Sequence, residues 1–256
     1  MIVTGASTGI GAAIARSCAL EGARVLVHGR DAERTRQVAR SLATEGATFT
    51  GELGDPGVCE ALVEEAVRAF GSLDGLVNNA ALTTRSDLAS TTPELFDRLL
   101  AVNLRAPLMI IRAAIGELRA SAGSVVNIGS LNAYCGEPEL LAYSLAKGAL
   151  MTMTRNLANA HASERVRFNL LNVGWTLTDN EDAIFRAQGY PSGWHRRLQP
   201  HVVPSGALLS PEQVSPHVIH WLSRESEPVT GAVVDVEQYP LIGRPGEGMR
   251  LEEPSS

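Results

Sequence analysis

Short apolar segments alternate with longer helical segments along almost the whole chain. The apolar segments are rich in Val, Ile and Leu and span residues 1–4, 23–28, 48–53, 75–78, 124–128, 167–172 and 232–236. Segments with helical periodicity span residues 10–21, 32–45, 57–70, 93–118, 141–162 and 211–222. Strands that are apolar on both faces and separated by helices are typical of a parallel sheet covered on both sides. The sequence therefore predicts a doubly wound α/β fold with seven parallel strands.

The chain has no internal repeat and no low-complexity linker, so residues 1–256 are predicted to form a single domain. Two segments break the alternation. Residues 174–210 have little apolar periodicity, and a long irregular excursion is often functional, so we expect a substrate lid there. Residues 240–256 are rich in Gly, Pro and Glu and are expected to form a polar tail on the surface. The first strand starts at residue 1, which leaves open a native start further upstream.

Composition excludes several classes of function. The net charge is −6 without a basic stripe, which argues against nucleic acid as a partner. No apolar run approaches the roughly 20 residues of a membrane span, and residues 1–5 do not resemble a secretory signal. Cys18, Cys59 and Cys135 are widely separated, which predicts free thiols and a cytoplasmic location. His217 and His220 share a predicted helix face but have no further ligand nearby, so no metal site is expected.

A glycine-rich turn, TGASTGIG at residues 4–11, connects the first predicted strand to the first predicted helix. Gly5 permits a tight turn, Gly9 lets the backbone approach a pyrophosphate, and Gly11 permits close packing of the helix on the sheet. The unpaired N–H groups at the start of the helix favour an anion. This Rossmann-type turn predicts dinucleotide contacts from Gly5, Ser7, Thr8, Gly9, Ile10 and Gly11.

Tyr143 and Lys147 are four residues apart in a predicted helix and therefore lie on the same helix face. A free phenol has a pKa of about 10, and a neighbouring ammonium is expected to lower it toward working pH. Such a pair is common on helices and carries little weight alone. Ser130 precedes Tyr143 by 13 residues and follows the strand 124–128, at the sheet edge where open α/β sheets bind ligands. Its hydroxyl could orient a substrate oxygen.

Together these residues resemble the short-chain dehydrogenase/reductase family, whose glycine turn has the same G-x-x-x-G-x-G spacing. The resemblance covers nearly the whole chain and implies hydride transfer between a nicotinamide and an alcohol or ketone carbon. It implies that Tyr143 exchanges the proton and that Lys147 binds the nicotinamide ribose. Asn103 matches the family asparagine that holds a water beside the lysine. The resemblance also implies a homo-oligomer, a tetramer or dimer, built on residues 93–118, 141–162 and the last strand.

The residues at the end of the second predicted strand are expected to decide between NADP and NAD. No acid occupies His28 or Gly29, and Arg30 could pair with a 2′-phosphate, so NADP is favoured over NAD. Alternatively, Arg30 only stacks on adenine, and Asp31 beside it weakens the argument. The resemblance implies further cofactor contacts from Glu52, Leu53, Asn79, Ala80, Ala81, Gly174, Thr176 and Thr178. Ala81 replaces a family glycine, and Val173 replaces a family proline.

Substrate contacts are predicted for Ser130, Asn132, Glu137, Tyr143, Trp175 and Trp194, and Cys135 is a further candidate. Indole faces mixed with polar groups suit a hydroxylated ligand such as a sugar or polyol, including a hemiacetal, better than a steroid or a long acyl chain. Arg196 or Arg197 could pair with an anionic group. The alternative is that most of these lid side chains face water.

Two other functions remain open from the sequence. The first is a 3-oxoacyl-[acyl-carrier-protein] reductase, which would need a basic docking patch near the active site, with Arg155, Arg165 and Arg167 as candidates. The second is a non-catalytic dinucleotide sensor. A sensor has no need of the tyrosine–lysine pair, so the catalytic interpretation is preferred.

Overall fold

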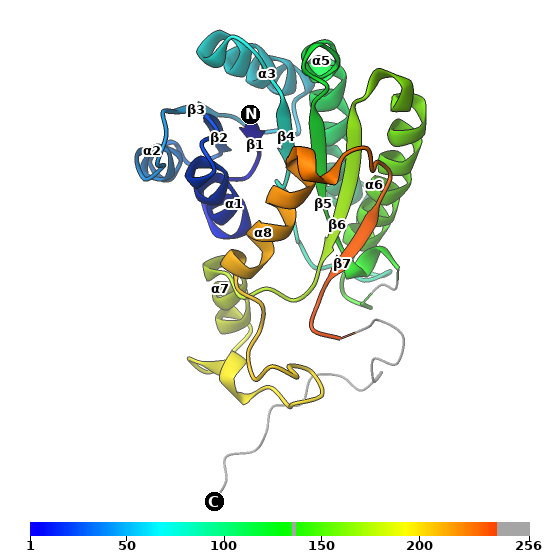
Figure 1. Cartoon of the computed structure of the whole chain (residues 1–256). Helices are drawn as coiled ribbons and strands as arrows, with labels where there is room; N and C mark the ends of the chain where they lie inside the picture. The colour runs from blue at the N-terminus through cyan, green and yellow to red at the C-terminus, as the bar shows by residue number, and fades with distance from the viewer. Residues whose placement is uncertain (135–136, 240–256) are drawn as a thin grey trace, which may run out of the picture.

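The computed structural model of the chain describes residues 1–134 and 137–239 and contains a parallel sheet between layers of helices (Figure 1). The strands are β1 (Ile2–Val3), β2 (Val25–Gly29), β3 (Gly46–Thr50), β4 (Gly75–Asn78), β5 (Ser124–Ser130), β6 (Arg167–Val173) and β7 (Val233–Val236). Their order in the sheet is β3-β2-β1-β4-β5-β6-β7, and every neighbouring pair is parallel. The predicted fold class is confirmed.

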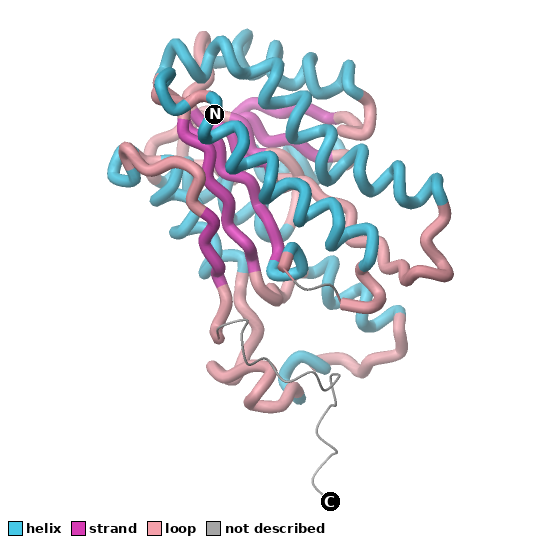
Figure 2. Tube along the Cα trace, turned by 90° about the vertical axis from the view of Figure 1, so that its right-hand side faces the viewer, coloured by secondary structure: helices cyan, strands magenta, loops and turns pink. Residues whose placement is uncertain are grey.

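Helices follow the strands in alternation. They are α1 (Gly9–Leu20), α2 (Ala32–Arg40), α3 (Pro56–Phe70), α4 (Pro93–Leu100), α5 (Ala106–Ser121), α6 (Leu141–Ala160), α7 (Asp179–Ala187) and α8 (Pro211–Leu222). Helices lie on both sides of the strands when the molecule is turned by 90° (Figure 2).

Alternating strand residues supply the two faces of the sheet. Ile2 belongs to a buried cluster with residues of α3 and α5, whereas the next residue, Val3, belongs to a cluster with residues of α1 and α8. Leu76 and Val77 divide between the clusters in the same way. Because successive strand side chains point to opposite faces, a strand that is apolar at every position can be buried on both.

The direction of chain winding changes between β1 and β4. Strands β2 and β3 lie on one side of β1, and β4 to β7 follow on the other. Such a switch point opens a crevice at the carboxyl ends of the strands, which is where doubly wound sheets bind ligands. Residues 174–210 lie beyond this edge of the sheet, in yellow below the strands in Figure 1. We call them the lid.

The lid is more ordered than the sequence predicted. Besides α7, it contains a buried cluster of its own, formed by Phe185, Trp194, Leu198, Val203 and Leu208. These apolar residues are spaced too irregularly to reveal a helix by periodicity. The lid therefore covers the edge of the sheet as a small packed unit.

Several predicted elements differ from the structure in their bounds or their regularity. The helix expected at 32–45 ends at Arg40, and the strand expected at 48–53 is Gly46–Thr50. The side chain of Ser41, the C-cap, donates to Val38 O at 2.7 Å, a local bond that competes with helix continuation. The helix expected at 93–118 contains a π-helical turn at Ala101–Arg105.

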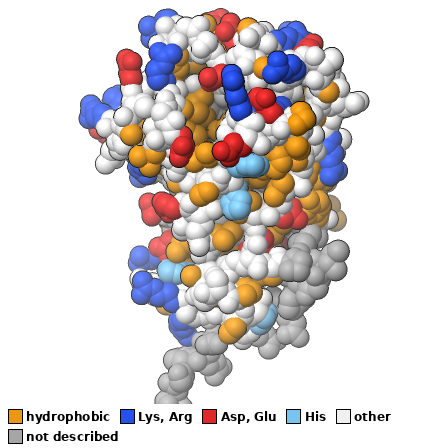
Figure 3. Space-filling view, in the orientation of Figure 1, with side chains coloured by type: hydrophobic (Ala, Val, Ile, Leu, Met, Phe, Trp, Pro, Cys, Tyr) orange, Lys and Arg blue, Asp and Glu red, His pale blue; other side chains and the backbone are white. Residues whose placement is uncertain are grey.

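The continuous helical run Pro93–Ser121 is long and apolar enough to cross a membrane by composition alone, with mean hydropathy 1.5. Half of that window is buried inside the fold. Ala106, Ile110, Ile111, Ala114 and Leu118 of this run belong to the buried cluster on the α3 side of the sheet, which accounts for these apolar residues within the fold. On the face seen in Figure 3, acidic and basic side chains are interspersed.

Candidate active site

The glycine turn after β1 has almost no room for side chains. Gly5 and Gly9 have φ of +62° and +55°, which an L side chain rarely adopts. A Cβ on Gly5 would lie 2.7 Å from Ala80 Cα, at the end of β4. A Cβ on Gly11 would lie 2.4 Å from both Gly5 O and Asn79 Nδ2. Backbone therefore approaches backbone closely at this turn.

Helix α1 begins without a side-chain cap, although its N-cap residue is Thr8. By contrast, side chains cap the first turns of α2, α3, α4, α7 and α8. The orphan N–H groups and the dipole of α1 are thus left open at the switch point of the sheet. This arrangement fits the pyrophosphate of a dinucleotide, with Ser7 half-buried and Thr8 exposed beside it.

Asn79 holds the turn rather than pointing at a ligand. Its Nδ2 donates to Thr4 O at 2.9 Å and to Gly5 O at 3.1 Å. Thr4 Oγ1 accepts from the backbone N–H groups of Asn79 and Ala80 at 3.0 and 3.1 Å. Both amide hydrogens of Asn79 are therefore used inside the protein. Ala80 and the exposed Ala81 follow at the carboxyl end of β4 and border the crevice.

His28 is a functional residue that sequence reasoning missed. Its buried imidazole Nδ1 accepts from Gly5 N at 3.2 Å, so Nε2 carries the proton and donates to Gly51 O at 3.2 Å. The neutral ring thus ties the glycine turn to the end of β3. Burial lowers the pKa of His28, an effect opposed by the bond to Gly51 and by the charge of Glu52. The clue in the sequence was a histidine inside an otherwise apolar strand.

This lowered pKa predicts acid sensitivity. Because the folded state binds a proton on His28 more weakly than the unfolded state, the stabilisation from neutral His28 is complete above the unfolded pKa of about 6.5 and is lost as pH falls. Each unit of lowering contributes about 1.4 kcal/mol. We expect the free energy of unfolding to fall less between pH 7.5 and 5.5 in His28→Phe than in the wild type, as measured by urea denaturation. Equal losses would contradict the assignment.

The adenine end of the predicted site differs from expectation in one residue. Arg30 directly follows β2, at the carboxyl end of the strands, as predicted. Its Nη1 is 3.6 Å from Glu52 Oε2. Both side chains are exposed, so this pair is weak and a phosphate could replace the carboxylate. The side chain of Leu53 is buried in the cluster on the α3 side of the sheet, where it cannot contact adenine.

Ser130, Tyr143 and Lys147 are brought together at the carboxyl end of β5. Ser130 ends the strand with its side chain buried and hydrogen-bonded to Tyr143, and Lys147 Nζ lies 5.6 Å from the Tyr143 ring centroid. Lys147 Nζ donates to Ile128 O at 2.7 Å and is 2% exposed. The predicted constellation of these three residues therefore exists as a cluster in which Ser130 and Lys147 are buried and Tyr143 is half-buried.

The charge states within this cluster differ from the sequence-based expectation. Burial raises the pKa of Tyr143 to about 12, and the hydrogen bond with Ser130 opposes this rise. Burial also lowers the pKa of Lys147 to about 8. Desolvation thus outweighs the expected effect of the ammonium on the phenol, and the prediction of a lowered tyrosine pKa is wrong for the protein alone. Tyr143 is a proton donor in this state.

Asn103 lies in the π-helical turn and holds a loop. Its Oδ1 accepts from Leu82 N at 2.7 Å, and its Nδ2 donates to Leu82 O at 2.9 Å. The side chain therefore acts like a neighbouring strand for the peptide groups of Leu82. Both ends of the amide are engaged there, so the structure gives Asn103 a positioning role.

The start of the lid is fixed by the carboxylate of Glu237, which follows β7. A Cβ on Gly174 would lie 2.2 Å from Glu237 Oε2, and the same oxygen accepts from Trp175 N at 3.1 Å. Thr176 is buried, with Oγ1 donating to Gly174 O. Thr178 caps α7 and approaches the glycine turn, where its Cγ2 would be 3.2 Å from a Cβ on Gly9.

The predicted substrate residues divide into two groups. Trp194 is fully buried, stacked on Phe185 with centroids 4.0 Å apart, so its predicted substrate contact is wrong. Trp175 is half-buried and packs against the same two rings. An indole buries more apolar area than any other side chain, so the lid uses these rings for its own core.

The remaining candidates lie between Ser130 and Tyr143. Asn132 is half-buried, its N–H donating to Ser130 Oγ at 3.2 Å, and Glu137 is exposed. Cys135 lies outside the described residues. Sequence reasoning missed Arg85, on the loop that Asn103 holds, and did not single out Glu181 in α7.

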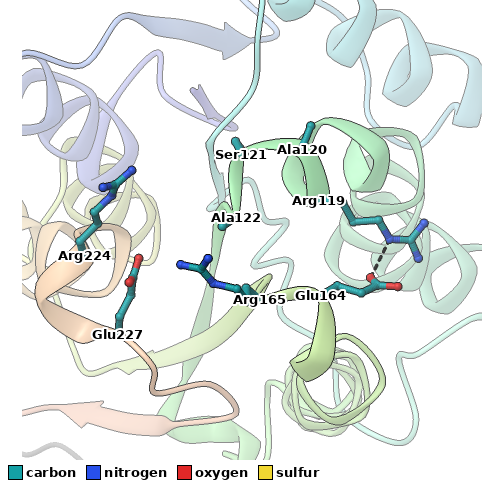
Figure 4. A pocket seen from close by; sticks show the side chains of 8 residues that line it. All are labelled: Arg119, Ala120, Ser121, Ala122, Glu164, Arg165, Arg224 and Glu227. Carbon is teal, nitrogen blue, oxygen red and sulfur yellow. Dashed lines mark hydrogen bonds and ion pairs between the residues drawn. The ribbon is translucent and has the colours of Figure 1, made fainter.

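Two cavities lie away from this cluster. One, of about 480 Å³, lies at the amino ends of the strands, opposite the reacting cluster. There Arg119 pairs with Glu164, and Arg165 extends toward Glu227 (Figure 4). The other, of about 670 Å³, lies between α1 and the lid. Within residues 1–134 and 137–239, no group of three or more His, Cys, Asp or Glu side chains could hold a metal ion.

Comparison with known proteins supports a single family. Residues 1–189 match the family model described as short chain dehydrogenase. The chain is 32% identical over 240 residues to 2-(S)-hydroxypropyl-CoM dehydrogenase 3 of Xanthobacter autotrophicus, covering 92% of this chain and 93% of that one. It is 30% identical to the same organism's "Inactive 2-(S)-hydroxypropyl-CoM dehydrogenase 2", covering 88% and 97%.

A solved structure agrees. It is a 3-oxoacyl (acyl-carrier-protein) reductase from Agrobacterium tumefaciens C58 with NADP bound, 31% identical, with TM-score 0.82 and coverage of 92% of this chain and 91% of that one. The fold is thus shared with that reductase over nearly the whole of both chains. The chain belongs to the short-chain dehydrogenase/reductase family, and it is a nicotinamide-dependent oxidoreductase acting on CH–OH groups.

Proposed function

We propose that this enzyme transfers a hydride between NADP and the secondary alcohol or ketone carbon, or the hemiacetal carbon, of a sugar-like or polyol-like substrate. The observation that carries the proposal is the cluster of Ser130, Tyr143 and Lys147 at the carboxyl end of β5. A half-buried phenol beside a buried hydroxyl and a buried ammonium serves no evident structural need, whereas carbonyl reduction needs a proton donor and an oxygen-orienting group.

The residues present fit a dinucleotide. The open first turn of α1 would hold the pyrophosphate, Arg30 the adenosine end, and Lys147 the nicotinamide ribose. Bound nicotinamide supplies or accepts the hydride. Lys147 Nζ donates to Ile128 O, which orients the ammonium and leaves it further N–H donors for a ribose hydroxyl.

Proton transfer is assigned to Tyr143. In reduction, its phenol donates a proton to the carbonyl oxygen, and its raised pKa keeps it protonated at neutral pH. Ser130 Oγ orients the same oxygen and stabilises its developing charge. In oxidation, Tyr143 must act as a phenolate, so that direction is favoured by rising pH.

Preference for NADP over NAD is supported by Arg30, whose partner Glu52 is an exposed surface carboxylate. The NADP bound in the structurally similar reductase agrees with this assignment. NAD is the alternative cofactor, since the exposed Glu52 carboxylate could accept a hydrogen bond from a ribose hydroxyl.

A 3-oxoacyl-carrier reductase is the second candidate, favoured by the structural similarity to the 3-oxoacyl (acyl-carrier-protein) reductase from Agrobacterium tumefaciens C58. Of the three arginines that could form the basic patch it would need, Arg155 is exposed on α6, the helix that carries Tyr143, whereas the other two lie away from the catalytic cluster. Arg167 is buried and donates to Trp221 O at 3.1 Å, near the end of α8. Arg165 lies at the opposite edge of the sheet from Tyr143. An acidic carrier would therefore find neither arginine beside the catalytic cluster.

A homo-oligomer and a cytoplasmic location are also proposed. Leu108 of α5 and Leu145 of α6 are 38% and 52% exposed, on the helices expected to pair between subunits. Cys18 and Cys59 are free and buried, which suits a reducing compartment.

The test is a nicotinamide absorbance screen of sugars, polyols and oxoacyl thioesters with NADP and NAD. We expect turnover of at least one polyol or sugar, with kcat/KM higher for NADP than for NAD. Turnover restricted to thioesters would favour the carrier-linked reductase. Tight cofactor binding without any turnover would favour the non-catalytic sensor, a relevant outcome because one relative is named inactive.

A further inference from the structure

Two neighbouring acids at the start of α7 each accept a hydrogen bond from an indole. Glu181 Oε1 accepts from Trp175 Nε1 at 2.8 Å, and Asp182 Oδ1 accepts from Trp194 Nε1 at 3.0 Å. The two indoles pack together in the lid, so both carboxylates are held by a rigid support. The two acids nevertheless lie in different surroundings.

Glu181 is diverted from the capping role that its position would give it. It stands three residues after the N-cap Thr178, as in a capping box, and its N–H donates to Thr178 Oγ1 at 3.1 Å. The reciprocal bond, from the N-cap backbone to the Glu181 carboxylate, is not formed. In α8, by contrast, Ser210 and Gln213 form both halves of the box. The Glu181 carboxylate thus gives up a local stabilising bond to lie against Trp175.

Few neighbouring groups stabilise the negative charge of the Glu181 carboxylate. Burial raises the pKa of Glu181, while the Trp175 hydrogen bond and the charge of Arg85 lower it and Glu137 raises it. Within residues 1–134 and 137–239, no hydrogen bond or ion pair engages Oε2 of Glu181. Arg85, whose Nη1 is 3.6 Å from Glu139 Oε2, lies over the Phe185 ring with Cζ 5.6 Å from its centroid.

The reacting cluster lies within electrostatic reach of Glu181. The charges of Glu181 and Glu137 both raise the pKa of Tyr143, to which Ser130 is hydrogen-bonded. The register of the sheet pairs Ser130 with Val173, two residues before Trp175, so Glu181, which the Trp175 indole holds, lies at the same end of the sheet as Ser130 and Tyr143. Asp182 instead lines the cavity between α1 and the lid, together with Gly9, Arg16 and His195.

We propose that Glu181 is a specificity-determining residue, whose free carboxylate oxygen accepts a hydrogen bond from a donor group of the substrate, a hydroxyl or an ammonium, near the reacting carbon. This inference rests on the proposed function. Trp175 fixes one oxygen of the carboxylate and so positions the other without loss of rotamer freedom on binding. Glu181 is half-buried and its free oxygen is not sealed inside the protein, so a ligand can reach it, and a substrate that brings a hydrogen-bond donor is favoured there.

The same arrangement disfavours anionic substrates. Glu181 and Glu137 are both acidic, and the cation among these neighbours, Arg85, already faces Glu139. A sulfonate, phosphate or carboxylate beside the reacting carbon would meet like charge from the half-buried Glu181 and the exposed Glu137. The substrate class is therefore neutral or cationic, with a hydrogen-bond donor.

Four alcohols with the same reacting carbon test this selectivity: 1,2-propanediol, 1-amino-2-propanol, 2-butanol and 2-hydroxypropane-1-sulfonate. In the wild type, we expect the diol and the amino alcohol to exceed 2-butanol and the sulfonate in kcat/KM. Glu181→Gln keeps an acceptor for Trp175 but removes the charge. A hydrogen bond to a charged group contributes enough for a change of about ten- to a hundredfold. We expect losses of about tenfold for the diol and about a hundredfold for the amino alcohol, and a gain for the sulfonate.

Asp182→Asn is the matched control, because it makes the same chemical change one residue further along α7, at the other carboxylate–indole bond. Its ratios of kcat/KM among the four alcohols should equal those of the wild type. Ratios that change equally in both variants would overturn the proposal, since they would report a general disturbance of the lid. Unchanged ratios in Glu181→Gln would overturn it as well.

A second readout needs no turnover. Absorbance titration of tyrosinate, with Tyr143→Phe subtracted, measures the pKa of Tyr143, which Ser130, Lys147, Glu137 and Glu181 surround. This pKa should be lower in Glu181→Gln than in the wild type and unchanged in Asp182→Asn. An equal pKa in Glu181→Gln and the wild type overturns the proposal while leaving the function proposed above intact. Turnover of none of the four alcohols by an enzyme that is active in the sugar and polyol screen overturns the recognition by Glu181 alone, whereas absence of turnover in the whole screen overturns the proposed function as well.

Discussion

Replacing Tyr143 by phenylalanine is expected to lower kcat by about 10²- to 10⁴-fold, while the dissociation constant for the nicotinamide cofactor stays within about twofold. General acid–base catalysis by one side chain contributes a factor of this size. Phenylalanine preserves the half-buried ring beside Lys147, so the packing of α6 should be retained. Steady-state kinetics with the best substrate of the screen and cofactor titration by fluorescence give the two quantities.

Tyr134→Phe is the matched control for this substitution. Tyr134 is 43% exposed, and its hydroxyl donates to Asp235 Oδ1 at 3.1 Å, at the edge strand β7. The control should keep the wild-type kcat. If Tyr143→Phe retained more than a tenth of the wild-type kcat, another group would have to supply the proton, and the assignment of Tyr143 would be wrong.

A single methyl group at Gly11 should weaken cofactor binding about ten- to a hundredfold. A Cβ there would lie 2.4 Å from the carbonyl oxygen of Gly5, a backbone atom that cannot rotate away. The helix start or the glycine turn must therefore move. Overpacking of this kind costs about 1–3 kcal/mol, which corresponds to the stated range in binding if the strain is relieved at the pyrophosphate site. Isothermal titration with NADP measures Gly11→Ala against the wild type.

Gly116→Ala supplies the comparison. Gly116 lies within α5, is exposed, and a Cβ there would have no heavy atom within 4 Å. Alanine should stabilise this helix by about 0.5–1 kcal/mol and leave cofactor affinity unchanged. Wild-type affinity in Gly11→Ala would mean that the turn absorbs the methyl group and that its geometry is not essential for binding.

The sheet and the reacting cluster were predictable because both depend on short-range patterns. Continuous apolar strands between helical segments can be buried only in a covered parallel sheet, and the carboxyl ends of its strands necessarily gather Gly5, Ser130 and Asn78 at one edge. Tyr143 and Lys147 share a face by helix geometry alone. These inferences need no knowledge of distant contacts.

The errors arose where distant contacts decide. Nothing local in the sequence reveals that Trp194 stacks on Phe185 instead of facing a ligand. Nor does it reveal that the side-chain amide of Asn79 donates both its hydrogens to carbonyl groups of the glycine turn. The pKa of Tyr143 was assigned the wrong direction because spacing identifies the neighbouring ammonium but not the depth of burial. The role of His28 depends on a turn 23 residues away.

The π-helical turn at Ala101–Arg105 sets the angle about the helix axis between the residues that precede it and those that follow it. An α-helix advances about 100° per residue, so an extra residue in one turn rotates everything that follows relative to what precedes it. Deleting one residue would give a regular helix but would swing either α4 or the amide of Asn103 away from its partner, Leu82. The irregularity is thus a phase adjustment that lets one helix face serve the sheet and the loop bordering the active site together.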